Sequence, residues 1–506
     1  MDAQQTTFFQ RHLTLIYSII ISLGGIVFGI DGGLMATTIS HASFKRYMFG
    51  PSETNNPVLG AINSTYSAGQ CVGALVSGWF INKYGRRAGM KVSTIIAFIG
   101  AGITTGAVDS GMLIAGRTVT GIATGALLSI MPAYISEISR REQRALLVGI
   151  MGMSDAVGYM LANWIGFAGE FAKGQGQWRI PLATQLPGTV LLYLLVMILP
   201  QSPRWLIQKD RGDEAYTILR DLHQRQGEDY VLGEMAQITA QVRMETEEAK
   251  QVYVMDLFSR RYIRRTATAG YMMCITQLAG AGVIQSYQSL FYAGLGFKGN
   301  TILLISGCYG LMGVIGQGFN LWFIADKWPR VRTMVSGSLV LAVMLSLLMA
   351  LSKFYGKGQN IAGSSAGVAF IFLFSGLNAL FFNSTTFVIA AEVLPTHLRG
   401  YGMGFALACK GATSLWLSQV TPIAFAAIQW KFYAVFIFTL VFAAFFCAFL
   451  LPETNQLTLE EIGAAFGDKK MTKDLNEVIQ DVQQGDKGFV AHVEDVNQLA
   501  TEQATV

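Results

Sequence analysis

Long apolar segments, separated by short polar ones, make up most of this chain. Each apolar segment has about 20 residues or more, the length at which an α-helix crosses the ~30 Å hydrocarbon core of a bilayer. The first segment opens an unbroken series and is too long to be a cleaved signal peptide. We therefore predict an all-α membrane protein with twelve transmembrane helices. The predicted spans are residues 13–36, 58–81, 90–109, 112–137, 145–168, 179–200, 265–295, 301–325, 332–352, 364–392, 400–428 and 430–451.

Short polar motifs occur once in each half of this series. Three pairs recur in the same order, with offsets of 255, 244 and 252 residues. The paired segments are Glu137 to Arg144 and Glu392 to Arg399, residues 82–87 and 326–332, and residues 200–202 and 452–454. Such a repeat predicts two pseudo-symmetric six-helix bundles with a site between them, which is the architecture of a secondary transporter.

The polar stretches between and after these bundles divide the chain into five parts. We predict a cytoplasmic N-terminus (1–12), an N-terminal six-helix bundle (13–200), a cytoplasmic helical linker (201–264), a C-terminal six-helix bundle (265–451) and a cytoplasmic tail (452–506). Because both repeats that enclose the cavity lie in one chain, we expect a monomer embedded in the lipid bilayer.

The composition agrees with this prediction. Of the residues, 52% are hydrophobic and 14% are charged, whereas a soluble protein carries about 25% charged residues. The net charge of +5 is small, but lysine and arginine concentrate in alternate loops. By the positive-inside rule, those loops and both termini are cytoplasmic. The sequence shows no nucleotide-binding loop, catalytic triad or metal-ligand cluster. This pattern argues against an enzyme, an ATP-driven pump, a bound cofactor or metal, and a nucleic-acid partner.

Glutamate and arginine are paired where predicted helices end in the cytoplasm. Glu137 precedes Arg144 between the fourth and fifth helices, and Glu392 precedes Arg399 between the tenth and eleventh. Arginine can hold a carboxylate bidentately, so such pairs can lock two halves together on the cytoplasmic side. We interpret them as a latch that is made in the outward-open state and broken in the inward-open one. The alternative is that they are interfacial charges that only fix topology.

Taken together, the motifs resemble those of the sugar porters of the major facilitator superfamily, over residues 13–467. The motifs that carry the resemblance are Phe28-Gly29-Ile30-Asp31, Gly85-Arg86-Arg87, Gly116-Arg117 with Gly121 and Gly125, Pro132-Ala133-Tyr134 with Glu137, residues 200–204, and Pro452-Glu453-Thr454. Asn82 and Gln201 depart from the family, which usually has Asp and Glu there. With the resemblance, the predicted cytoplasmic latch comprises Arg86, Glu137, Arg144, Arg204, Arg330, Glu392 and Arg399.

Two charged residues lie inside predicted membrane helices at matched depth. Asp31 in the first helix and Arg117 in the fourth each lie about five residues, or ~7–8 Å, from the outer end of their helix. An isolated charge at the bilayer centre costs about 2.5–3.5 kcal/mol, so buried charges pair. Protonation of Asp31 would release Arg117 and change helix packing; the alternative is a static salt bridge. Proton-coupled members of the family carry an acid and its partner at these places, so the resemblance implies proton symport.

The seventh predicted helix carries groups that can bind the hydroxyls of a polyol. These are Gln277, Gln285 and Tyr287, although buried amides can also bridge helices. The resemblance implies that Gln277 binds solute and that Tyr287 is an outer gate. Residues 276–282 keep only the second glutamine of the family's Gln-Gln-x-x-Gly-x-Asn pattern, and their glycines permit a helix break.

Other positions depart further from the family. Gly152 stands where a glutamine is usual, and Phe387 replaces a tryptophan, with Asn383 one turn before it. Lys410 begins a Lys-Gly pair where the family commonly has Asn-Trp, and the nearest tryptophan is Trp416. We predict that Asn383, Lys410 and Trp416 belong to the substrate site.

Lys410 lies about ten residues, or ~15 Å, above the inner end of its helix. Asp155 lies 255 residues earlier, at the repeat-related position. Lys410 can bind a substrate carboxylate, pair with Asp155 as a gate or second coupling element, or snorkel into a water-filled cavity without a specific role. The sequence leaves these three interpretations open.

The leading hypothesis is a proton-coupled symporter that imports a monosaccharide-like solute by alternating access. A sugar acid or other organic anion bound by Lys410 is the alternative. A non-transporting nutrient sensor on the same fold is a remote third possibility. The composition resembles fungal proton-coupled sugar transporters, which implies a multi-pass protein of the plasma membrane.

Overall fold

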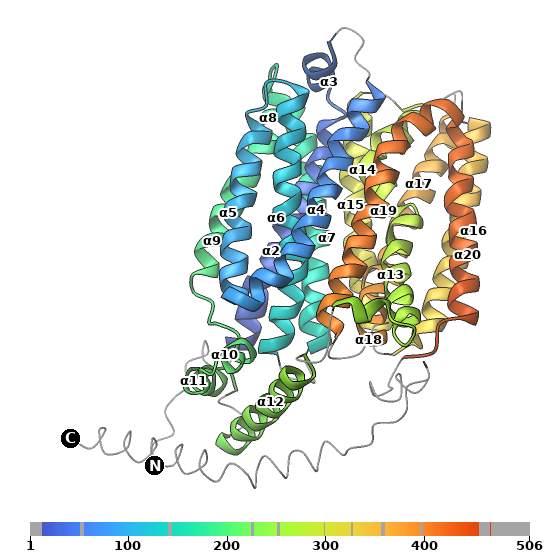
Figure 1. Ribbon diagram of the computed structural model, residues 1–506. Coiled ribbons are helices and arrows are strands. Elements are labelled where there is room, and N and C mark those ends of the chain that lie inside the picture. The colour runs from blue at the N-terminus through green and yellow to red at the C-terminus, as the bar shows by residue number, and fades with distance from the viewer. Residues whose placement is uncertain are drawn as a thin grey trace.

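The computed structural model describes residues 13–50, 55–139, 144–223, 227–249, 254–297, 299–324, 327–355, 360–394 and 398–454, together with Phe466. Within these residues every regular element is a helix. The helices form two adjacent bundles, one from each half of the chain, with short linker helices at one end (Figure 1). The predicted N-terminus, 1–12, and nearly all of the predicted tail lie outside the described residues.

The first bundle contains the helices that precede residue 200. They are α2 (Leu13–Thr38), α3 (Ala42–Phe49), α4 (Asn56–Tyr84), α5 (Arg86–Thr105), α6 (Ser110–Ile138), α7 (Arg144–Gly169), α8 (Gly176–Ala183) and α9 (Gln185–Val196). The linker region holds α10 (Pro203–Gln208), α11 (Gly212–His223), α12 (Glu228–Ala249) and the short η3 (Val254–Phe258).

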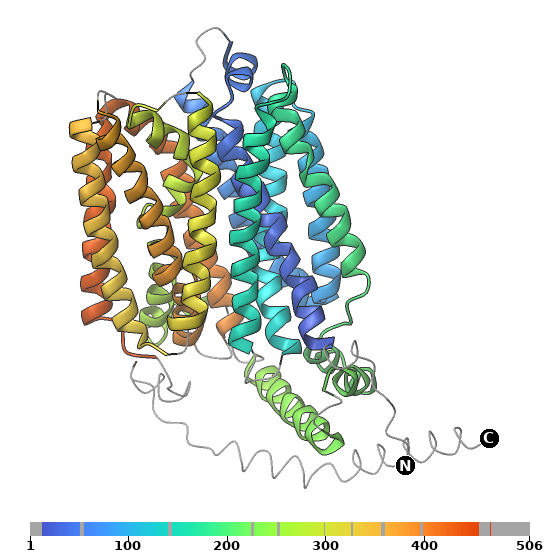
Figure 2. The same ribbon diagram turned by 180° about the vertical axis from the view of Figure 1, so that it is seen from behind.

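The second bundle repeats this arrangement with more interrupted helices, as seen from behind in Figure 2. Its members are α13 (Ile263–Leu278), α14 (Ala281–Gly294), α15 (Asn300–Phe319), η4 (Asn320–Ile324), α16 (Arg330–Tyr355), α17 (Ile361–Asn378), η5 (Ala379–Asn383), α18 (Thr385–Val393), α19 (Arg399–Ile428), η7 (Gln429–Phe432) and α20 (Tyr433–Phe449).

Ten helical runs in the described residues are long and apolar enough to cross a membrane. The sequence predicts twelve spans, and the difference arises at two places. The last two predicted spans fall in one 49-residue run, Tyr401–Phe449, which contains α19 and α20. The second predicted span falls on α4, which is not among the ten. Polar residues such as Ser64, Ser67 and Gln70 lower the hydropathy of α4, and they face the other half of the protein.

The predicted break in the seventh span is present between α13 and α14. Gly280 adopts a left-handed backbone conformation with φ of +84°, which favours glycine. A Cβ atom at this position would also lie 2.8 Å from the Phe436 ring. Glycine is therefore favoured at position 280 for two reasons: the turn needs a left-handed backbone, and α20 packs closely against this residue.

Glycine also lets α2 pack directly on the backbone of α7. Gly25, Gly29 and Gly33 recur every four residues on α2, so they lie along one face of the helix. A Cβ atom on Gly29 would lie 2.2 Å from the backbone oxygen of Asp155, and one on Gly25 would lie 2.9 Å from that of Met151. Small residues at this spacing are the common solution for helix contacts in a bilayer, where close van der Waals contact replaces the hydrophobic effect.

The two halves meet mainly along two helix pairs, α4 with α19 and α7 with α15, and α14 also contacts α2 and α7. Hydrogen bonds cross the first pair from Ser64 Oγ to Gln419 Oε1 (2.8 Å) and between the hydroxyls of Ser67 and Ser414 (2.9 Å). Polar side chains of α4 and α19 therefore hold the two halves together in this conformation.

The linker helices pack on the first bundle around a small apolar cluster that includes Leu206, Leu219 and Met235. The indole of Trp205 donates to the backbone oxygen of Asn82 at 3.2 Å, and Thr14 Oγ1 donates to that of Leu222 at 3.2 Å. These bonds fasten α10 and α11 to the ends of α4 and α2. We call this end of the molecule the linker end and the opposite one, where α3 lies, the far end.

The glycine contact between α2 and α7 gives a direct stability prediction. Gly29→Ala should lower the stability of the detergent-purified protein by about 1–3 kcal/mol, because the methyl group overpacks against the α7 backbone. Gly32→Ala on the same helix is the matched control, since nothing lies within 4 Å of a Cβ there. Thermal unfolding should separate the two variants, and equal transition temperatures would contradict this description of the interface.

Candidate functional site

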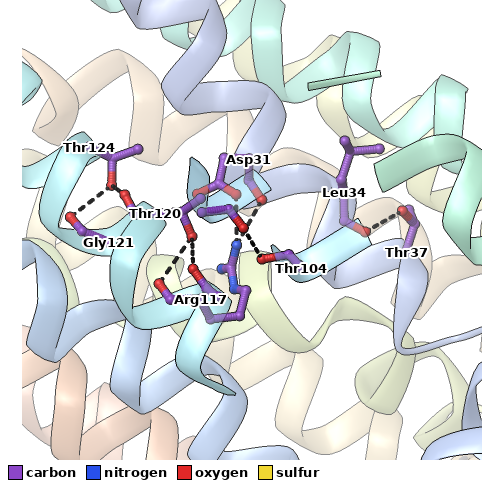
Figure 3. A network of polar contacts seen from close by, with 10 residues as sticks. Asp31, Leu34, Thr37, Thr104, Arg117, Thr120, Gly121 and Thr124 are labelled. Atoms are coloured by element: carbon purple, nitrogen blue, oxygen red, sulfur yellow. Dashed lines mark hydrogen bonds and ion pairs between the residues drawn. The ribbon is translucent and has the colours of Figure 1, made fainter. Parts of the chain in front are cut away.

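Asp31 and Arg117 form an ion pair in the interior of the first bundle. Arg117 Nη1, on α6, lies 2.8 Å from Asp31 Oδ1, on α2, and Figure 3 shows the guanidinium pointing at the carboxylate. The two residues are 4% and 2% exposed, respectively. The structure thus brings the side chains of Asp31 and Arg117 together, as we predicted from the sequence.

The surroundings of this pair leave part of each group unsatisfied. The guanidinium lies 4.0 Å above the ring of Tyr66, on α4, so that face is covered by a cation–π contact. Asp31 Oδ2 and Arg117 Nε are buried and have no hydrogen-bond partner among the described residues. Protonation of Asp31 would remove the charge that holds α2 to α6.

A small cavity of about 30 Å³ between α4, α6, α13 and α19 collects polar groups. Two amides, one hydroxyl and one ammonium face it, from Gln70, Gln277, Ser414 and Lys410. The other lining residues are Ala74, Gly125, Leu128, Leu407 and Gly411. Amides and hydroxyls can donate to and accept from the hydroxyls of a polyol, while the apolar residues can contact its ring face. Gln277 and Lys410 were predicted from the sequence, whereas Gln70 and Ser414 were not.

Gln277 approaches the backbone of Gly282, the position at which the family pattern has Asn. A Cβ atom on Gly282 would lie 2.4 Å from Gln277 Oε1. The glutamine side chain therefore folds over the start of α14, in space that an asparagine at this position would occupy.

Tyr287 closes the far end of the space between the halves. Its side chain is fully buried, and its hydroxyl donates to the backbone oxygen of Ser418 on α19 (2.8 Å) and lies 3.4 Å from that of Leu59 on α4. The backbone of Tyr287 departs from helical geometry, with φ of −124° and ψ of 27°. Tyr287 therefore bridges the two halves at a kink in α14.

Two further contacts join α7 and α14 near Tyr287. The hydroxyl of Tyr159 donates to the backbone oxygen of Gln285 (2.8 Å), and Gln288 Nε2 donates to Asn163 Oδ1 (2.6 Å). The structure thus places the backbone of the predicted binding residue Gln285 at the contact between the halves. Its side chain is half-buried and does not line the cavity described above.

Asn383 belongs to an amide network on the other side of the second bundle. Its Nδ2 donates to Gln317 Oε1 (3.0 Å), and Gln317 Nε2 donates to Ser384 Oγ (2.8 Å). The amide of Gln317 lies 3.3 Å from the place a Cβ on Gly152 would take. Gln317 was not identified from the sequence, because nothing distinguishes it there from other amides in apolar segments.

Trp416 does not join these groups. It is 46% exposed, and its neighbours Ser414 and Gly411, not Trp416, face the cavity. A change of one or two residues along a helix rotates a side chain by 100–200°, on the order of half a turn. The proximity of Trp416 to Lys410 in sequence therefore did not place it in the site.

Lys410 faces the cavity with its ammonium 5.0 Å from the centre of the Phe387 ring. Asp155 and Lys410 act on each other electrostatically. Among the described side chains, however, they do not form an ion pair within the 4.0 Å limit that defines one. Lys410 therefore lines the cavity without an ion-pair partner among the described side chains.

At the linker end, each predicted latch glutamate contacts an arginine within its own half. Arg86 Nη2 lies 2.6 Å from Glu137 Oε1, and both side chains are about 90% buried. Arg330 Nη2 lies 3.8 Å from Glu392 Oε1, and Glu392 Oε2 accepts a hydrogen bond from Thr454 Oγ1 (2.7 Å).

The remaining latch residues are less completely defined. The side chains of Arg144 and Arg399 lie outside the described residues, so their predicted role stays a prediction. Arg204 is half-buried on α10. The Pro-Glu-Thr motif has a clear function: the carboxylate of Glu453 accepts from the backbone nitrogens of Arg330 (2.7 Å) and Val331 (3.1 Å), at the N-terminus of α16.

The chain is similar in sequence to several fungal transporters. It is 31% identical over 477 residues to the MFS-type transporter criB of Aspergillus cristatus, covering 92% of this chain and 97% of that protein. It is 26% identical to the high-affinity glucose transporter of Kluyveromyces lactis, covering 90% and 86%. It is also 26% identical to the quinate permease of Emericella nidulans, covering 93% and 92%.

The fold is similar to that of the proton:xylose symporter XylE bound to 6-bromo-6-deoxy-D-glucose. The TM-score is 0.74 at 20% sequence identity, covering 90% of this chain and 99% of that one. The family model described as "Sugar (and other) transporter" matches residues 17–466. A match of this extent, together with the relatives above, shows a transporter rather than an enzyme. The chain belongs to the sugar porter family of the major facilitator superfamily.

Proposed function

We propose that this protein is a proton-coupled symporter that imports a monosaccharide-like solute by alternating access. The observation that carries the proposal is the buried Asp31–Arg117 pair, which joins α2 to α6 and leaves Asp31 Oδ2 unpartnered. A titratable pair between two membrane helices couples a proton to helix packing, because the charged and neutral forms of the acid favour different arrangements. The proposed location is the plasma membrane, with both termini in the cytoplasm.

The contacts at the far end suggest how the cycle runs. With Tyr287 bonded to α19 and close to α4, the proposed extracellular side is closed. Movement of the two halves would enlarge the cavity of about 30 Å³ and admit the solute, whose hydroxyls Gln70, Gln277 and Ser414 can hydrogen-bond. Opening to the outside requires the Tyr287 bonds to break and α14 to move about the Gly280 bend. A proton on Asp31 would loosen α2 from α6 in the same cycle.

Asp31→Asn tests the proton assignment. The variant should lose uphill accumulation in proteoliposomes with an inward proton gradient, so that the internal to external solute ratio falls to about one. Exchange of labelled for unlabelled solute should persist, since exchange needs no net proton movement. Asp213→Asn on the exposed surface of α11 is the matched control. Uphill uptake by Asp31→Asn would show that another group carries the proton.

A second candidate solute is an anion, such as a sugar acid. Lys410 faces the cavity, and among the described side chains it lacks an ion-pair partner within 4.0 Å. A lysine in a bilayer interior is costly and is kept where it meets an opposite charge. Similar fungal proteins include several quinate permeases, and quinate is a polyhydroxylated carboxylate.

Competition between a hexose and its uronic acid distinguishes the two solutes. If the solute is an anion, wild-type protein should prefer labelled D-galacturonate over D-galactose. Lys410→Gln should then reduce galacturonate uptake at least about tenfold, the loss of one charge-assisted hydrogen bond. Lys353→Gln, an exposed lysine, is the control. Preference for the hexose, unchanged by Lys410→Gln, would leave Lys410 and Asp155 as a gate or coupling pair.

Glu137→Gln and Glu392→Gln test the latch. Glu137→Gln should cost about 3–5 kcal/mol and slow transport, because it leaves the buried Arg86 without a counter-charge. Glu392→Gln should have a smaller effect, since Glu392 is 27% exposed and lies 3.8 Å from Arg330. Thermal unfolding and initial uptake rates measure both. Unchanged rates in both variants would mean that these charges only fix topology.

A further inference from the structure

Asp155 and Lys410 occupy equivalent places in the two halves. Each lies eleven residues after the first residue of its helix, Arg144 in α7 and Arg399 in α19. Eleven residues of α-helix span about 16 Å, so both charges are near the middle of the membrane. One charge therefore belongs to each half of the transporter, and the distance between them can change as the halves move.

The ammonium of Lys410 has an apolar surface on one side and the solute cavity on the other. The Phe387 ring lies 5.0 Å from it, and the amides of Gln70 and Gln277 line the same cavity. A solute carboxylate that enters the cavity can reach Lys410, while its hydroxyls reach the amides. The position combines the two kinds of recognition that a polyhydroxylated carboxylate requires.

Asp155 lies on α7, does not line the cavity, and is near enough to Lys410 for the two charges to act on each other. Its backbone is pressed against α2, where Cβ atoms on Gly25 and Gly29 would lie 3.2 Å from its nitrogen and 2.2 Å from its oxygen. Of the titratable groups on the neighbouring helices, Asp31 is paired with Arg117, and Tyr309 on α15 packs edge-on against Tyr159 of α7. Lys410 on α19 is the charge that acts on Asp155.

The electrostatic consequence depends on what occupies the cavity. With the cavity empty, the positive charge of Lys410 favours the charged form of Asp155. When a solute carboxylate neutralises Lys410, Asp155 becomes an uncompensated negative charge in a region of low dielectric constant, close to a second carboxylate. Such a group binds a proton, because burying an isolated carboxylate costs far more than burying its neutral acid.

We infer that Asp155 is a second proton carrier, which is protonated when a polyhydroxylated carboxylate binds Lys410. This inference rests on the anionic candidate of the proposed function. One proton travels on Asp31 and one on Asp155, so two protons accompany each solute anion. The cycle then moves one net positive charge inward. A neutral hexose leaves the Asp155–Lys410 pair charged and travels with the Asp31 proton alone.

The charge balance can be measured in proteoliposomes at equal internal and external pH. A potassium gradient with valinomycin sets an inside-negative potential, and labelled D-galacturonate reports uptake. Wild-type protein should accumulate galacturonate about tenfold for 59 mV, the value for one net charge. Asp155→Asn should carry one proton per anion, so its accumulation should no longer respond to potential but should still respond to a pH gradient.

Two internal controls separate this result from misfolding. D-Galactose uptake by Asp155→Asn should remain driven by potential if the hexose is carried, since its single proton resides on Asp31. Asp155→Glu, which keeps the acid, should retain the wild-type response with galacturonate. If Asp155→Asn does not fold, the wild-type ratio of two protons per galacturonate, measured from the balance of pH gradient and potential, still tests the inference.

The possible failures are distinguishable. If galacturonate uptake by the wild type does not depend on the membrane potential, the proposal of a second proton carrier is wrong. The proposal of an anionic substrate would still stand. A tenfold response retained by Asp155→Asn would show that another group takes the proton. If hexose is carried but neither galacturonate nor quinate is, the anionic candidate and this inference both fail, whereas proton coupling through Asp31 stands.

Discussion

The scarcity of partners for charge inside a bilayer is the constraint on which this structure depends. A charged side chain surrounded by hydrocarbon must find an opposite charge, a ring face or a polar cavity, and Arg117 and Lys410 both do so. Arg117 has Asp31 and the ring of Tyr66; Lys410 has the ring of Phe387 and the cavity. Such partnerships change when a proton or a solute arrives, and this makes the interior charges suitable for coupling.

Close helix contact is the second requirement, because a displaced proton matters only if the helices respond to it. On α2, the residues that approach α7 are glycines, and Asp31 follows Gly29 by two residues. The helix that carries the proposed proton acceptor is therefore packed backbone to backbone against the helix that carries Asp155. Helix α2 is therefore in direct contact with both α6, through the Asp31–Arg117 pair, and the backbone of α7.

The sequence predicted the parts of this account that depend on local pattern and repeated motifs. Helix positions, the break at Gly280, and the meeting of Asp31 with Arg117 could be inferred because periodicity, glycine and matched depth are visible in one dimension. The number of membrane spans was harder to predict, because the polar residues of α4 that face α19 lower the hydropathy of α4. The direction in which a side chain leaves its helix was hardest to predict. Trp416 does not line the cavity, whereas Gln70 does. Likewise, Glu137 and Glu392 contact Arg86 and Arg330, a choice that sequence spacing alone does not specify.

The central claim is that solute entry and proton entry are one event. The most direct test is to suspend proteoliposomes of the wild-type protein in weakly buffered medium without an imposed gradient and add solute while recording external pH. Coupling predicts that the medium becomes alkaline as solute enters, and that a protonophore abolishes the change. Solute uptake with no change in external pH would contradict the account and identify the protein as a passive carrier.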